Sequence, residues 1–91
     1  KTGNYTASAG EGVFMNTTSS ALTLTLPASP SIGDEVTFVD YAGTFDSNNL
    51  TIARNSSKIH GAEEDLTVAV ERAANTLVFT DSTQGWLLKS K

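Results

Sequence analysis

The sequence predicts an all-β fold, a small antiparallel β-sandwich or barrel-like module of seven to nine short strands. Thr, Ser and Asn make up 29 of the 91 residues, a composition typical of short strands joined by many turns. Leu, Ile, Val and Phe are interspersed singly among these polar residues. Helix-forming residues gather in one stretch only, residues 62–74.

In the first part of the chain, alternating apolar residues and turn residues define the predicted strands. Two strands are expected at Asn4–Ala7 and Gly12–Asn16, joined as a hairpin around Ser8–Glu11. Leucines then alternate with threonines over Ala21–Leu26, which is the period-2 pattern of a strand with one buried face. Pro27 ends this strand because proline cannot donate a hydrogen bond to the ladder.

Residues 27–34 are predicted to form an extended connector, with Ile32 tucked under it as a plug. A second clear strand is expected at Glu35–Asp40, with Val36 and Phe38 on one side, followed by a loop over residues 41–48. At the end of this strand, Asp40 is expected to accept hydrogen bonds from loop amides of the Tyr41–Gly43 turn. Residues 63–65 are acidic and leave a short helical turn open as an alternative before the next strand. The remaining strands are expected at Asn49–Arg54, at Lys58–Gly61 (a short strand or bridge), after Asp65, at Thr76–Thr80 and at Gly85–Ser90, with turns at Glu71–Asn75 and Asp81–Gly85.

Several predicted strands carry apolar residues on both faces, whereas a two-layer sandwich needs only one dry face for each sheet. Such second-face residues lie under loops or form a contact between subunits. A small domain without disulfides is marginally stable alone, which favours the subunit contact. The candidate interface residues are Val13, Met15, Val39, Val78 and Leu87.

Length and charge exclude several classes of protein. We expect residues 1–91 to form one module and, because the first residue is Lys, a segment of a longer or processed chain. The net charge of −4 argues against a nucleic-acid partner, which would require a basic surface. No apolar run approaches the roughly 20 residues of a membrane-spanning helix, so no membrane insertion is expected.

No pattern in the sequence predicts catalysis, a cofactor or a metal. There is no Cys, and the single His60 is predicted to be a turn residue with a solvent or backbone partner. The carboxylates at residues 63–65 fit a solvated turn, and no pair of acids stands out as a hydrolytic site. Asp46–Asn48 has alternate oxygen ligands but fits an Asx turn better than a calcium loop. Sequons at Asn4, Asn16, Asn49 and Asn55 are a mild excess, and no glycosylation is expected.

Two aromatic residues are candidates for contact with a ligand such as a sugar ring. Tyr41 lies beside the loop that contains Gly43, and Trp86 follows Gly85 at the start of the last strand. For Trp86 a place in the core or an interface is the alternative, because its alternation with Leu88 puts both on one face.

Three stretches together resemble a module of tailed-bacteriophage virion proteins. They are residues 5–14 (YTASAGEGVF), residues 26–40 (LPASPSIGDEVTFVD), and the later segments NNLTI, KIHG and GW. The order and spacing of these segments cover nearly the whole chain. The resemblance is to tail-fibre, baseplate and adhesin-like proteins, notably those of cyanobacterial phages.

This resemblance implies a non-enzymatic structural module located in the virion, part of a homotrimeric tail fibre or related appendage. The implied partners are further copies of the chain and other virion proteins. The alternatives are a capsid-decorating protein and a tip domain that binds a receptor or a host-surface glycan. No catalytic residue, cofactor or metal ligand is carried over from the family.

Overall fold

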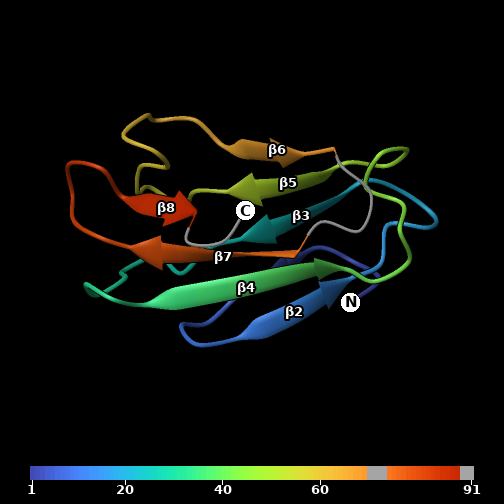
Figure 1. The fold of residues 1–91 in the computed structure, drawn as a ribbon, viewed down its shortest axis with the longest axis horizontal. Helices are drawn as coiled ribbons and strands as arrows, with labels where there is room; N and C mark the ends of the chain where they lie inside the picture. Colours follow the sequence, from blue (N-terminus) through green and yellow to red (C-terminus); the bar gives the residue numbers. More distant parts are fainter. Residues whose placement is uncertain (70–73, 89–91) are drawn as a thin grey trace.

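A computed structural model describes residues 1–69 and 74–88, and within these ranges the chain contains eight strands and no helix. The strands form two mixed sheets of four. Sheet A has the order β1 (Tyr5–Thr6), β3 (Leu22–Thr25), β5 (Leu50–Ala53) and β6 (Leu66–Val68). Sheet B has the order β2 (Gly12–Met15), β4 (Glu35–Asp40), β7 (Ala74–Phe79) and β8 (Trp86–Leu88). Figure 1 shows both sheets and the connections between them.

The first five strands alternate between the two sheets, so each connection in this part of the chain crosses from one sheet to the other. β1, β3 and β5 pair in parallel in sheet A, and β2 pairs in parallel with β4 in sheet B. The later strands pair antiparallel, β6 on β5, β7 on β4 and β8 on β7. The prediction of an all-β chain is confirmed, but the expected mostly antiparallel pairing is wrong, since three of the six pairings between described strands are parallel.

The predicted hairpin at the start of the chain is also wrong. β1 and β2 lie in different sheets, and the segment between them is an arch that crosses from one sheet to the other. Gly10 takes a left-handed conformation in this arch, and its N–H donates to the carbonyl of Glu35 in sheet B. The alternation of apolar residues fixes which face of a strand is buried, but it carries no information about the neighbouring strand.

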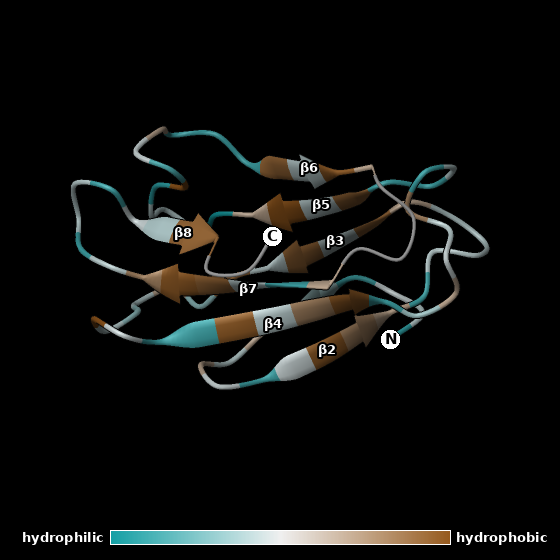
Figure 2. Cartoon of the chain, viewed as in Figure 1, coloured by the Kyte–Doolittle hydropathy of each residue, from teal (hydrophilic) through white to brown (hydrophobic). Residues whose placement is uncertain are grey.

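One hydrophobic core receives side chains from both sheets. Val36 and Phe38 are fully buried from β4, as the alternation predicts, and Leu24 and Ile52 meet the same core from sheet A. Figure 2 shows the hydrophobic residues recurring along the strands of both sheets. Phe45 lies between strands in the sequence but is fully buried against Phe38, with ring centroids 6.4 Å apart.

Most predicted strands are found, shorter by a residue or two, and Glu35–Asp40 has the predicted bounds. Ile59 forms bridges to Ala62 and Trp86, in agreement with the short bridge expected there. The predicted turn at Glu71–Asn75 is wrong at its end, because Ala74 and Asn75 already pair with β4 as part of β7. Residues 71–73 of that turn and the end of the predicted strand Gly85–Ser90 lie outside the described residues. No helix of the described ranges is long and apolar enough to cross a membrane.

The prediction that Ile32 plugs the connector is wrong, because its side chain is 80% exposed. The surrounding turn directs it outward. The N–H of Asp34 donates to the carbonyl of Ser31 at 3.0 Å, and the N–H of Ser31 donates to the Asp34 carboxylate at 2.8 Å. Gly33, in a left-handed conformation, donates its N–H to the carbonyl of Phe79. These contacts tie the backbone of the turn to sheet B and leave the side chain of Ile32 in solvent.

Candidate functional site

The outer face of sheet B carries three rows of side chains that point away from the core. The strand register aligns Phe14 with Val39 and Ala74, and it aligns Val78 with Glu35 and Leu87. Between these rows, the hydroxyl groups of Thr37 and Thr76 hydrogen-bond to each other, with their oxygen atoms 2.9 Å apart. Val39, Val78 and Leu87 are half-buried, so three of the five candidate interface residues lie on this face.

The other two candidate interface residues, Val13 and Met15, are placed differently. Val13 is 5% exposed and Met15 is fully buried, and both belong to the core. Their inclusion in an interface is therefore corrected. Phe14, between them, points to the opposite face of β2 and is 62% exposed. In a run of three apolar residues the composition does not show which face is inside, and here the middle residue faces outward.

Trp86 is also corrected as a ligand contact, because it is fully buried. Its ring meets the ring of Phe79 edge to face, with centroids 5.6 Å apart. Among the residues that the structure describes, the indole Nε1 has no hydrogen-bond partner. Trp86 is thus the core residue that its alternation with Leu88 gave as the alternative.

Tyr41, the other predicted ligand contact, is 61% exposed and lines a hollow of about 280 Å³ at the end of β4. We call this feature the aromatic hollow. Its other lining residues are Lys1, Thr2, Phe14 and Asn16. The carbonyl of Lys1 accepts the N–H of Asn16 at 2.8 Å, so the start of the chain is held against the edge of β2. Sequence analysis missed Phe14 as a surface residue, and the register with Val39 is what places it beside this hollow.

The loop beside the hollow is organised by Asp40, which is 2% exposed. Its carboxylate accepts N–H groups from Gly43 at 2.9 Å and from Thr44 and Phe45 at 3.1 Å. The prediction that Asp40 accepts from the amides of this loop is therefore confirmed. A fully buried threonine, Thr17, adds a hydroxyl contact to Thr44 at 2.6 Å. Tyr41 therefore lies between Asp40 and a loop whose backbone is held by these hydrogen bonds.

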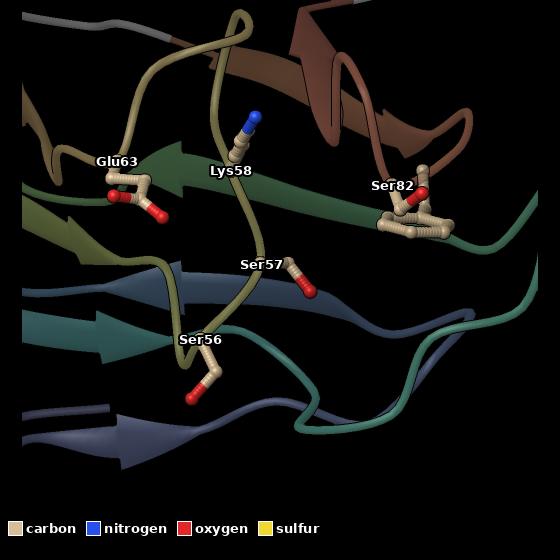
Figure 3. Close-up of a pocket in the computed structure, with 6 residues that line it drawn as sticks. Ser56, Ser57, Lys58, Glu63 and Ser82 are labelled. Atoms are coloured by element: carbon tan, nitrogen blue, oxygen red, sulfur yellow. The ribbon is translucent and has the colours of Figure 1, made fainter.

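A second pocket, also of about 280 Å³, lies near the opposite end of the fold (Figure 3). It is lined by Ser56, Ser57, Lys58, Glu63, Phe79 and Ser82. Figure 3 shows the labelled side chains pointing in different directions. No hydrogen bond joins the hydroxyl, ammonium and carboxylate groups of these lining residues, so the pocket does not pair a nucleophile with a base.

The single histidine and the segment Asp46–Asn48 make structural contacts. The His60 Nε2 accepts the N–H of Leu88 at 3.2 Å, and the backbone N–H of His60 donates to the carbonyl of Trp86 at 2.9 Å. The prediction of a backbone partner for His60 is thereby confirmed. The side-chain amide of Asn48 donates to the carbonyl of Thr17 at 2.8 Å. Within residues 1–69 and 74–88, no group of three or more His, Asp or Glu side chains is arranged to hold a metal ion.

One polar network shifts two pKa values in the arch between β1 and β2. The Glu11 carboxylate accepts the N–H of Ser8 at 2.6 Å and the hydroxyl of Tyr5 at 2.8 Å. These two hydrogen bonds, the one from Ser8 being the stronger influence, lower the pKa of Glu11 below 4.5. The same hydrogen bond to Glu11 raises the pKa of Tyr5 above 10.0. This network serves the fold, because it fastens the crossing from sheet A to sheet B.

The chain matches no protein-family model, and no curated protein is similar to it in sequence.

Proposed function

We propose that this chain is a non-enzymatic structural module of a bacteriophage virion, a building block of a homotrimeric tail fibre or related appendage. In this proposal the two sheets form a small sandwich whose second apolar face meets neighbouring copies. The proposal rests on the sequence resemblance described above and on one structural observation, the half-buried apolar side chains of Val39, Val78 and Leu87 on the outer face of sheet B. The polar groups of the pockets and loops contact backbone or point apart, which supports a structural role rather than a catalytic one.

The proposed contact between copies is the outer face of sheet B, centred on Val39, Val78 and Leu87. Each of these side chains is half-buried within one chain and has further apolar surface to lose on association. Full burial of an aliphatic side chain contributes about 1.5–3 kcal/mol before the costs of association. The hydroxyl groups of Thr37 and Thr76 hydrogen-bond to each other in the middle of the face. The face also carries Glu35, in register with Val78, so the proposed contact is the patch of Val39, Val78 and Leu87 and not the whole face.

Two substitutions test this proposal. The double variant Val78→Thr, Leu87→Thr keeps β-forming side chains but adds hydroxyls to the outer face. We expect the wild-type chain to sediment as a trimer at micromolar concentration and the double variant to approach the 9.6 kDa of one chain. Thr67→Ser, on an exposed position of β6 in sheet A, is the matched control and should retain the mass of the wild type. A double variant with an unchanged mass would exclude this face as the interface.

A further inference from the structure

We propose that the free edge of β2 receives one further strand, which runs parallel to β2 and leads directly into Lys1. This strand is held by backbone groups at the edge of sheet B, so it is independent of the lateral contact between side chains on the outer face. β2 is the outermost strand of sheet B on this side, as β1 is of sheet A. Figure 1 places the N-terminus beside the end of β2.

The start of the chain already lies in the position of such a strand. The N-terminal ammonium group of Lys1 donates to the carbonyl of Phe14, and the carbonyl of Lys1 accepts the N–H of Asn16 at 2.8 Å. Hydrogen bonds from one residue to the two neighbours of a residue on the next strand are the arrangement of a parallel pair. Lys1 therefore lies opposite Met15, and its backbone runs in the direction of β2.

The other edge of sheet B is covered in the same way by a segment of this chain. The N–H of Trp86 in β8 donates to the carbonyl of Lys58 at 2.8 Å, and the N–H of His60 donates to the carbonyl of Trp86 at 2.9 Å. Ile59, between these two residues, forms a parallel bridge to Trp86. Covering an edge with a further segment is a common protection against pairing with other chains.

Lys1 covers only one end of the edge of β2. The carbonyl of Met15 accepts the N–H of Tyr41 at 3.1 Å, on the side of β4. Successive residues of a strand direct their backbone groups to opposite sides, so those of Gly12 and Phe14 face the free edge. Among the residues that the structure describes, the N–H of Phe14 and the carbonyl of Gly12 have no hydrogen-bond partner. One donor and one acceptor thus stay open next to Lys1.

A strand that extends two residues ahead of Lys1 satisfies both groups. Its residue at the second position ahead of Lys1 lies opposite Val13, accepts the N–H of Phe14 and donates to the carbonyl of Gly12. Side chains alternate between the two faces of a strand. The residue opposite Val13 faces the core, because Val13 is 5% exposed, and the residue opposite Phe14 lies on the outer face. An apolar residue is therefore favoured at the second position ahead of Lys1 and not at the first.

The position at this edge suits chain that is continuous with Lys1 and not a separate peptide. A strand from another molecule would have to end where Lys1 begins, because Lys1 occupies the next position along β2. The Lys1 side chain fixes this position from the other sheet, since its ammonium group lies 4.3 Å from the centre of the Tyr5 ring in β1. The Tyr5 hydroxyl in turn donates to Glu11 at 2.8 Å. Lys1 is thus in contact with both sheets and sets the register of the added strand.

The test uses the full chain with four residues added ahead of Lys1. In the first form valine and threonine alternate, with valine at the second and fourth positions ahead of Lys1, so that a valine lies opposite Val13. In the second form the two residue types exchange places. In the third form the extension consists of glycine and serine. The three extensions are equal in length, and the first two are equal in composition.

Amide hydrogen exchange measured by NMR reports the pairing. We expect the first form to slow the exchange of the Phe14 N–H about tenfold relative to the unextended chain, because this group gains a hydrogen-bond partner. The second form should slow it less, and the third should leave it unchanged. The N–H of Thr6 is the internal reference. It faces the free edge of β1, since the next N–H, of Ala7, donates to Thr25 of β3, and its exchange should be the same in all forms.

Equal exchange of the Phe14 N–H in the first form and in the unextended chain would overturn the proposal, and so would equal slowing by the extension of glycine and serine. Slowing that appears in the unextended chain only as the protein concentration rises would assign the edge to a second copy instead. The double variant Val78→Thr, Leu87→Thr separates this contact from the lateral one. The first extension should protect the Phe14 N–H in that variant too, whatever mass the variant has in solution.

Discussion

Asp40 is the single residue on which the loop beside the aromatic hollow depends most. Asp40→Ala removes the acceptor for the N–H groups of Gly43, Thr44 and Phe45 and leaves them without their partner in a mostly buried place. We expect a loss of about 3 kcal/mol in the free energy of unfolding, because hydrogen bonds to a charged group are among the strongest that a protein makes. Urea unfolding followed by tryptophan fluorescence measures this loss.

The exposed Asp46 in the same loop provides the control. Asp46→Ala should change stability by less than about 0.5 kcal/mol. Equal effects of the two substitutions would show that the amide contacts of Asp40 do not hold the loop.

Single residues also show where prediction from sequence ends. The role of Asp40 followed from its place at a strand end before a loop with Gly43, a local relation that the sequence contains. The exposure of Phe14 and Ile32 did not follow, since hydrophobicity alone favours burial for both. Phe14 faces outward because its neighbours Val13 and Met15 occupy the core side of β2, and Ile32 because its turn is tied to Phe79. Both causes are tertiary contacts.

At the scale of elements, the arch between β1 and β2 gives the fold a dependence on pH. The pKa of Glu11 is lower in the folded chain than its ordinary 4.5. The contribution of Glu11 to the free energy of unfolding is therefore complete above pH 4.5 and is lost as the pH falls through the lowered pKa. The raised pKa of Tyr5 has the opposite sign. Its contribution is complete below 10.0 and is lost as the pH rises through the raised pKa.

We expect Glu11→Gln to remove the acid-dependent part of this behaviour. Between neutral pH and about pH 3, the urea midpoint of the wild type should fall more than that of the variant. Glu64→Gln, at an exposed carboxylate, is the control and should follow the wild type. Parallel curves for wild type and Glu11→Gln would contradict the assignment.

The entry into β8 depends on a glycine for two independent reasons. Gly85 has φ +72°, a left-handed conformation, and a Cβ added there would lie 2.0 Å from the carbonyl oxygen of Lys58. We expect Gly85→Ala to cost about 3 kcal/mol or more, because the backbone contact between Trp86 and Lys58 must shift. Thermal unfolding measures the change.

Gly12→Ala is the matched control, since a Cβ at Gly12 meets nothing within 4 Å and its φ is not left-handed. This variant should keep the stability of the wild type to within about 0.5 kcal/mol. A wild-type melting temperature for Gly85→Ala would show that the corner at β8 is more adaptable than its geometry indicates.

Most of the elements themselves were predictable, but their partners were not. Alternation located the strands in the ranges now assigned to β3, β4 and β5, because the period of two is a local property. Pairing is decided by long connections such as residues 27–34 and 41–49, which carry the chain to the opposite sheet. The arch at residues 8–11 is short enough for a hairpin, and only the contacts of Glu11 and Gly10 across it distinguish the two.

For the whole molecule, the central question is what covers the outer face of sheet B. Of the five residues predicted for an interface, Val13 and Met15 lie in the core. The other three lie on the outer face of sheet B, which also includes Phe14 and Ala74. A chain of this size buries a limited fraction of its surface, so the burial of further apolar surface between copies would add stability. The account therefore depends on association of copies rather than on a catalytic or metal-binding site.

The most direct test is the mass of the wild-type chain in solution, measured by sedimentation equilibrium over a range of protein concentrations. The account predicts a smallest stable unit of three times the 9.6 kDa of one chain. A mass of 9.6 kDa at every concentration would contradict it.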